Sequence, residues 1–247
     1  MKSSTFPEFP EFSEFLASRR STRDFLPDEV SSEVIDELLK DALTAPSWSN
    51  TRPFKVAIAT GERRDRISAE FQRRWAVLSK ALRGSLWEKI KLAIFRQGLP
   101  TSNWRIARPY VPELRPRAER VGKELYEMIG IERGNRKARD EQWGKNYQFF
   151  GAPVAIFIYF HKSLDVFAAS DAGLMLENLI LSAHSRGLGT CLQGAVNVWD
   201  DAIRSEFEIP RDYRLLCGLA IGYPSTAKIN EFKANRLDPS EIKFKEK

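Results

Sequence analysis

The stretch Arg19-Arg20-Ser21-Thr22-Arg23 is the point from which the rest of the chain is best interpreted. It places three guanidinium groups and two hydroxyls within five residues. A guanidinium is planar, permanently charged and forked, so it binds phosphate or carboxylate through paired hydrogen bonds. The five residues alone leave two interpretations open: an anion cradle for a phosphorylated cofactor, and a solvated basic helix end, where arginine complements the helix dipole.

Around this stretch, apolar residues recur with helical spacing in some segments and run continuously in others. Helices are predicted at 11–19, 32–43, 171–187 and 200–207, and strands at 54–59, 153–160 and 214–221. Segment 153–160 is apolar throughout, so we expect a strand buried on both faces. Helix 171–187 is apolar around most of its surface, and we expect it to be buried too. The order of elements indicates an α+β fold, with a sheet flanked by helices.

Residues 62–146 form a long, charged and mostly helical segment. Four prolines occur from Pro100 to Pro116, both included. The segment has too few large apolar residues for a core of its own. We therefore interpret the chain as a single domain over 1–247, with a helical excursion at about 62–146. Insertions of this kind often cover a site as a lid.

Composition narrows the class of protein. The chain has 247 residues, of which 43% are hydrophobic and 29% charged, as in ordinary soluble proteins. Its longest apolar run, Pro153 to Phe160, is too short to span a membrane. The N-terminus lacks the apolar core of a signal peptide, and two cysteines imply no disulfide framework, so we expect a cytoplasmic location. The net charge of +6 is dispersed, which favours small anionic substrates over nucleic acid.

A second polar stretch, Ala-Pro-Ser-Trp-Ser-Asn-Thr-Arg-Pro at 45–53, connects a predicted helix to a predicted strand. It could be a ligand loop or simply a turn, because Ser, Asn and Pro favour turns. Other chemistries find less support. His161 and His184 have no Cys or carboxylate partner at metal-ligand spacing, so no metal site is expected. The hydrolase signature Gly-x-Ser-x-Gly is absent from the sequence.

Taken together, five separated segments resemble the FMN-dependent nitroreductase family. They are the arginine stretch 19–23, the loop 45–53, Gly-Ala-Pro at 151–153, the helix 171–187 running into Gly-Thr-Cys-Leu-Gln-Gly at 189–194, and Ile-Gly-Tyr-Pro at 221–224 followed by Asn230, Phe232 and Arg236. Each segment is short, but their order and spacing together are fairly specific. The resemblance implies a mostly antiparallel central sheet flanked by helices, and a homodimer with FMN at the subunit interface.

The resemblance also implies roles for particular residues. Arg19 would bind the FMN phosphate, with Arg20 and Ser21 on phosphate or ribityl oxygens and Arg236 closing from the other side. Arg23 would lie near the pyrimidine edge of the flavin, where reduction places negative charge. Gln193 and Gly194 would approach the ring. The loop would reach the flavin of the partner subunit through Pro46, Ser47, Ser49 and Asn50.

Two further points follow from the resemblance. The family often has glutamine where this chain has Arg52, which leaves the role of that position open and could favour an anionic group. A roof over the flavin could come from aromatic residues, although a core or interface position is the better interpretation for any one of them. These aromatic residues are Trp48, Trp104, Tyr110, Tyr147, Phe149 and Phe150.

The resemblance thus predicts an FMN-dependent, NAD(P)H-oxidising reductase of nitroaromatic or similar electron-poor organic substrates, working by a ping-pong mechanism. NADPH or NADH would be the electron donor. No catalytic acid or nucleophile is expected, because flavin N5 carries the chemistry. Alternatives on the same fold are ene reduction, dehalogenation and substrate oxidation. A non-catalytic flavin-binding or nucleic-acid-binding module is a rival from another class.

Overall fold

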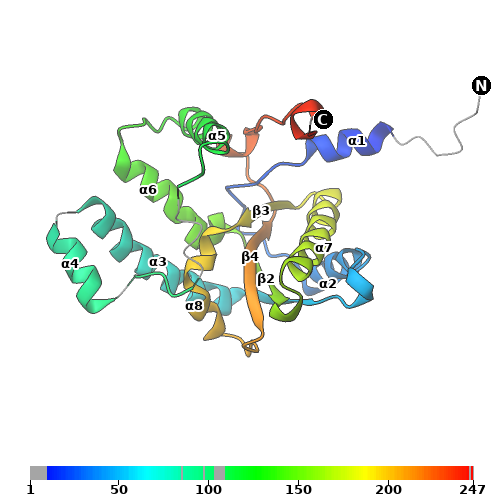
Figure 1. Cartoon of the computed structure of the whole chain (residues 1–247), viewed down its shortest axis with the longest axis horizontal. Coiled ribbons are helices and arrows are strands. Elements are labelled where there is room, and N and C mark those ends of the chain that lie inside the picture. The colour runs from blue at the N-terminus through cyan, green and yellow to red at the C-terminus, as the bar shows by residue number, and fades with distance from the viewer. Residues whose placement is uncertain (1–9, 85, 97, 103–108, 245, 247) are drawn as a thin grey trace, which may run out of the picture.

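A four-stranded antiparallel sheet with strand order β1-β2-β4-β3 lies at the centre of the molecule (Figure 1). The computed structural model describes residues 10–84, 86–96, 98–102, 109–244 and 246. The strands are β1 (Phe54–Thr60), β2 (Val154–His161), β3 (Gly189–Gln193) and β4 (Tyr213–Gly222). All of β2 except its last residue is buried, which confirms the prediction of a central strand covered on both faces.

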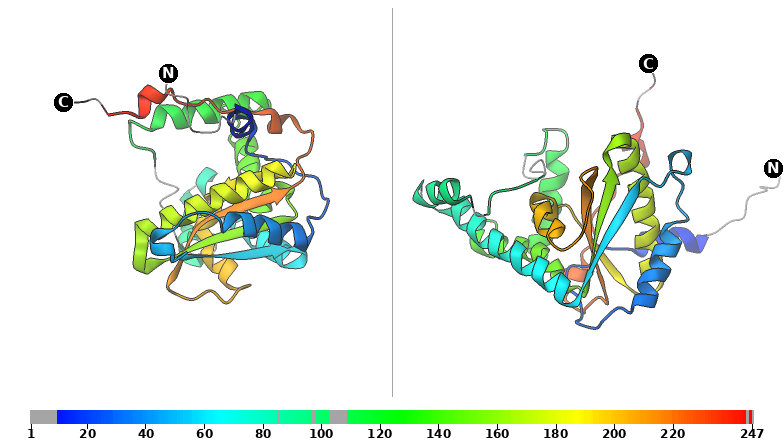
Figure 2. Two further views of the ribbon diagram at one scale, coloured as in Figure 1. Left: turned by 90° about the vertical axis from the view of Figure 1, so that its right-hand side faces the viewer. Right: turned by 90° about the horizontal axis from the view of Figure 1, so that it is seen from below.

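Helices cover both faces of this sheet (Figure 2). On one face, Ile156 and Ile158 pack in a cluster with residues of α2 (Ser32–Ala42) and α7 (Asp165–Ser185). On the other face, Phe157 and Tyr159 pack with residues of α3 (Gly61–Arg83) and α8 (Asp200–Arg204). Because successive side chains of a strand point to opposite faces, the apolar run of β2 serves both clusters. The predicted α+β fold is confirmed.

Helix boundaries largely follow the sequence signals. α1 spans Pro10–Ser18, and the predicted cap Ser31 accepts a hydrogen bond from the backbone N–H of Val34 at the start of α2. α7 begins at Asp165, six residues before the predicted start at 171. α8 ends at Arg204, earlier than the predicted 207.

The prediction that helix 171–187 is buried around most of its surface was wrong for one side of α7. Leu176 and Leu179 are buried against the sheet, whereas Val166, Phe167 and Leu174 are exposed. The sheet and α2 cover only the opposite side of the helix. The segment Lys162–Ser185 is also long and apolar enough to cross a membrane, but the core helix of a soluble protein meets the same criteria.

Between β1 and β2 the chain forms α3, α4 (Leu86–Phe95), α5 (Arg115–Met128) and α6 (Arg136–Gly144). α3 contributes Ile67 and Phe71 to the core, whereas α4 has no buried residue and projects from the body in Figure 1. The division into one domain with an excursion stays a prediction.

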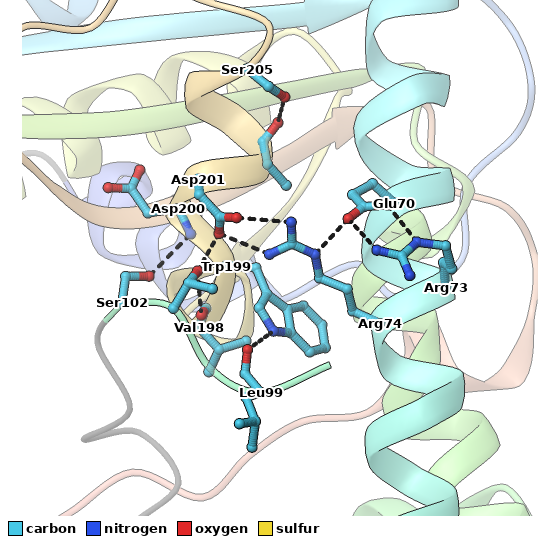
Figure 3. Close-up of polar contacts among 12 residues, drawn as sticks. Glu70, Arg73, Arg74, Leu99, Ser102, Val198, Trp199, Asp200, Asp201 and Ser205 are labelled. Carbon is cyan, nitrogen blue, oxygen red and sulfur yellow. Dashed lines mark hydrogen bonds and ion pairs between the residues drawn. The ribbon is translucent and has the colours of Figure 1, made fainter. Parts of the chain in front are cut away.

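The chain rejoins the body after α4 through hydrogen bonds shown in Figure 3. Trp199 Nε1 donates to the carbonyl of Leu99 (3.1 Å), and the N–H of Thr101 donates to the carbonyl of Val198 (2.8 Å). Nearby, Arg74 of α3 bridges Glu70 and Asp201, at 2.6 and 2.8 Å. These contacts fix α3 against α8 and hold residues 99–101 beside the 3₁₀ turn that precedes α8 (Ala195–Trp199).

Candidate functional site

The arginine stretch is an extended segment beside β3, and not the end of a helix. α1 ends at Ser18, Ser21 pairs with Thr190 in a parallel bridge, and the N–H of Thr22 donates to the carbonyl of Thr190 (2.8 Å). Thr22 is buried against Gly189, where an added Cβ would lie within 2.9 Å of Thr22 Cβ and Cγ2. Glycine at 189 therefore lets the stretch dock on the sheet edge.

Asn230 fixes the far end of the stretch. Its Oδ1 accepts from the N–H of Arg23 (2.7 Å), and its Nδ2 donates to the carbonyls of Asp24 (2.7 Å) and Ser225 (3.0 Å). The Asn230 side chain thus joins the C-terminal part of the chain to the arginine stretch. Asn230 and Asp24 are 206 positions apart in the sequence. The sequence motif contained Asn230 but suggested no role for it.

Arg19 and Arg20 line a pocket of ≈270 Å³ together with Ser18, His184 and Asn230. None of the described residues that line this pocket carries a carboxylate. His184 Nε2 lies 2.6 Å from Ser18 Oγ. Burial and the charge of Arg19 lower the pKa of His184, which favours the neutral form of its ring. The pocket therefore offers two fixed positive charges with neutral donors beside them, which suits an anionic group such as phosphate.

Gln193 and Gly194 lie where β3 ends. Gln193 Nε2 donates to the carbonyl of Asn146 (2.7 Å), while its buried Oε1 has no hydrogen-bond partner among the described residues. Gly194 has an ordinary φ of −73°, and an added Cβ would meet nothing within 4 Å. The open space beside Gly194 leaves room for the predicted approach of a flavin ring.

The loop 46–50 is anchored at the other end of α7. The N–H of Trp48 donates to Asp171 Oδ2 (2.9 Å), and the Trp48 ring packs on Phe167 at 4.6 Å between centroids. Ser49, Asn50 and Arg52 all adopt positive φ. Pro46, Ser49 and Asn50 are exposed, and Ser47 Oγ accepts from the N–H of Arg52 (3.1 Å). This loop is more than a simple turn, because it is held in a strained form that presents polar groups outward.

The loop and the arginine pocket are not brought together within one chain. Asp171, which holds the loop, and His184, which lines the pocket, are 13 residues apart on α7. At about 1.5 Å per residue, this separation is about 20 Å along the helix axis.

Three predicted phosphate or flavin ligands, Ser21, Arg23 and Arg236, are not among the residues that line the pocket. Ser21 lies in the bridge to Thr190. Arg236 is on the exposed C-terminal segment, and its Nη1 donates to the carbonyl of Ala234 (2.8 Å). Arg23 lies near Cys191: burial raises the pKa of Cys191 to about 11, and the charge of Arg23 opposes that rise. The predicted positions of Arg236 and Arg23 around a flavin stay predictions.

The chain is similar in sequence to known proteins along most of its length. The sequence model described as the Nitroreductase family matches residues 16–223. This chain belongs to the nitroreductase family. It is 31% identical over 222 residues to a 4-nitrobenzoate reductase of Pseudomonas putida, covering 90% of this chain and 89% of that protein. It is 27% identical over 231 residues to a nitrobenzene nitroreductase of Ectopseudomonas oleovorans, covering 94% and 92%.

Solved structures of nitroreductases agree with the fold. An FMN and NADPH-dependent nitroreductase NfnB from sphigopyxis sp. strain HMH superposes with a TM-score of 0.75 at 27% identity, covering 95% of this chain and 98% of that one. An FMN-dependent NfnB from Mycobacterium smegmatis, solved in complex with NADPH, gives a TM-score of 0.77 at 24% identity, covering 96% and 98%. The resemblance inferred from the five segments is confirmed.

The aromatic residues considered for a roof divide into two groups in this nitroreductase. Tyr147, Phe149 and Phe150 are buried in the core cluster with Phe71, as the alternative interpretation expected. Trp48 and Tyr110 are exposed. Trp104 lies outside the described residues. Within the described part of the chain, no group of three or more His, Cys, Asp or Glu residues is placed to hold a metal ion.

The sequence patterns did not indicate the place of His184 in the pocket of this nitroreductase. The one available signal was its position just before Gly187-Leu188-Gly189, where the helix ends and the chain turns into β3. In the fold, His184 lines the same pocket as Arg19 and Arg20 of the arginine stretch.

Proposed function

We propose that this chain is an FMN-dependent, NAD(P)H-oxidising reductase of nitroaromatic or similar electron-poor compounds, acting by a ping-pong mechanism. The observation that carries the proposal is the pocket in which Arg19 and Arg20 converge without a carboxylate among its described lining. It lies at the position where the nitroreductase resemblance expects the FMN phosphate. Relatives named for 4-nitrobenzoate and nitrobenzene, matched over nearly their whole length, support the substrate class.

In this proposal, Arg19 and Arg20 bind the phosphate of FMN, and Ser21 adds a hydroxyl. Gln193 and Gly194 receive the edge of the ring, and Arg23 provides positive charge near its pyrimidine end. When bound, FMN supplies a ring that accepts a hydride at N5 and returns the electrons to the second substrate. The chain itself needs to hold that ring, leave one face open and admit the two substrates in turn.

The same proposal includes a homodimer with FMN at the subunit interface. Trp48, Phe167 and Leu174 form an exposed apolar face along one side of α7, and exposed apolar surface of this kind favours association. A second copy on this face would bring its loop 46–50, with Pro46, Ser47, Ser49 and Asn50, to a pocket that the loop of the same chain cannot reach. Arg236, on the C-terminal segment of the chain, would approach the phosphate of FMN from the other side. A cytoplasmic location is part of the proposal.

A direct experiment uses the colour of the flavin. We expect the purified protein to be yellow, to bleach with NADPH under nitrogen, and to regain its colour on addition of 4-nitrobenzoate. Running NADH in parallel identifies the preferred donor, and quinones and enones in place of the nitro compound test the other flavin reactions. A colourless protein that takes up no FMN would contradict the proposal, as would a bleached flavin that enones reoxidise and nitroarenes do not.

A further inference from the structure

A second pocket, of ≈600 Å³, lies at the opposite end of β4 from the arginine pocket. Its lining includes Lys162, Asn197, Asp200, Arg204, Arg211 and Arg214. It opens at the start of β4, beside Tyr213, whereas the arginine pocket borders Pro224, just beyond the end of that strand. Gly222 lies nine positions after Tyr213, which is about 30 Å along a strand. The two pockets are therefore separate sites.

The second pocket has an excess of positive charge. Arg204 is used internally: it pairs with Asp200 (2.7 Å) and donates to the carbonyl of Tyr213 (2.6 Å). Among the described residues, neither Lys162 nor Arg211 has a carboxylate within ion-pair distance, and Arg214 has one exposed partner, Asp165, at 3.5 Å. Three cationic side chains from two segments thus border one cavity with little compensation.

One residue in the lining of the pocket, Asn197, also carries a buried acceptor that pairs with no described residue. Asn197 is only 5% exposed, and its Nδ2 donates to the carbonyl of Leu216 (2.6 Å). Its Oδ1 has no partner among the described residues. Ser102 holds this region in place: its Oγ donates to the carbonyl of Asn197 (2.5 Å) and accepts from the N–H of Asp200 (3.0 Å; Figure 3). Buried polar atoms are nearly always paired, so this oxygen points to a donor from outside the chain.

We propose that this pocket binds a small organic phosphate. The phosphoryl group is held by Lys162, Arg211 and Arg214, and a hydroxyl or amino group of the ligand donates to Asn197 Oδ1. Three separate cations are better matched by a phosphate dianion than by a single carboxylate, which carries only one negative charge. The cavity is far larger than a phosphate ion, which leaves room for the organic part. This site is independent of the proposed flavin chemistry.

Isothermal titration calorimetry on the full-length, FMN-saturated protein at constant ionic strength tests the proposal. The probes are ribose 5-phosphate, ribose and inorganic phosphate. We expect ribose 5-phosphate to bind more tightly than either of the other two. The variant Arg211→Ala/Arg214→Ala should lose affinity for it by about tenfold or more. The matched control Arg133→Ala/Lys137→Ala removes the same charge from an exposed region near α6 and should bind like the wild type.

Four results would overturn the proposal. Unchanged affinity in the Arg211→Ala/Arg214→Ala variant would exclude those arginines, and equal losses in both double variants would show a general charge effect. Inorganic phosphate binding as tightly as ribose 5-phosphate would remove the role of Asn197. Flavin absorbance and circular dichroism, recorded on every sample, show that the variants are folded. Release of FMN by the probe would place it in the flavin site and would also overturn the proposal.

Discussion

Single residues decide whether the arginine stretch meets the sheet. Thr22 fits beside Gly189 because glycine has no Cβ, and Asn230 uses both ends of its amide to hold Arg23 and Asp24. The sequence could suggest an anion site at the arginines, because guanidinium chemistry is local, and that assignment stays a prediction. It could not predict the roles of Asn230 and His184, because these depend on which distant segments meet in the fold.

Gly189→Ala tests the docking of the stretch. The added Cβ would lie within 2.9 Å of Thr22 Cβ and Cγ2, so we expect a loss of about 1–3 kcal/mol in the free energy of unfolding, with weaker FMN binding. Gly194→Ala is the matched control, because its Cβ meets nothing within 4 Å in the chain. It should keep the Tm and weaken FMN binding alone. A Gly189→Ala protein with wild-type Tm and flavin content would refute the role of this contact.

His184 reports on the arginine pocket through its pKa. Burial and the charge of Arg19 lower this pKa below the ordinary 6.5, so the unfolded chain binds the proton more readily and stability falls as the pH drops through 6.5. A phosphate dianion beside Arg19 would offset that charge, so FMN should raise the pKa of His184. NMR titration of the His184 imidazole signals with and without FMN measures this change. No change for His184 would place the phosphate elsewhere.

At the scale of elements, β2 was predictable and α7 only partly so. A strand buried on both faces is apolar at every position, and β2 shows that pattern directly. α7 is apolar around most of its surface as well, yet one side is exposed in the single chain. Apolar composition indicates that a surface becomes buried but does not say whether the same chain or a second copy covers it.

The attachment of α3 to α8 gives a prediction at this scale. The hydrogen bond from Arg73, with help from Arg74, lowers the pKa of Glu70 from 4.5 to about 2. This stabilisation is therefore complete above pH 4.5 and is lost as the pH falls towards 2. Glu70→Gln should lower the free energy of unfolding by about 1–2 kcal/mol at pH 7, allowing for solvent screening, and by less at pH 3.

Urea unfolding at both pH values measures this effect. Glu88→Gln on the projecting α4 is the control, because Lys91, at 3.2 Å on an exposed surface, is the one ion-pair partner of Glu88 among the described residues. Its effect should stay within about 0.5 kcal/mol. Equal effects of the two substitutions at pH 7, or a Glu70→Gln effect that does not shrink at pH 3, would show that the network contributes no specific stability.

At the scale of the whole molecule, the two groups of predicted flavin ligands lie apart. Arg19 and Arg20 lie near the C-terminal end of α7, and the loop with Ser49 and Asn50 lies near its N-terminal end. The sequence could indicate both groups through the family resemblance. Their separation of about 20 Å appears only when the chain is folded, and it is the structural reason for proposing that two copies share each flavin.

A heterodimer built from two tagged variants tests this claim. One copy carries Arg19→Ala/Arg20→Ala, and the other carries Ser49→Asp/Asn50→Asp, which keeps residue types that tolerate positive φ. Each homodimer should bind FMN at least about tenfold more weakly, because charge-assisted contacts are lost or a negative charge is added. The heterodimer would have one site with both halves intact and one with both halves altered.

The deciding measurement is the FMN content of the purified heterodimer. If the pocket of one copy and the loop of the other form each site, the heterodimer binds about one FMN per two chains and shows about half of the wild-type nitroreductase activity. If each chain builds its own site, both sites are altered, and the heterodimer retains as little FMN and activity as the two homodimers.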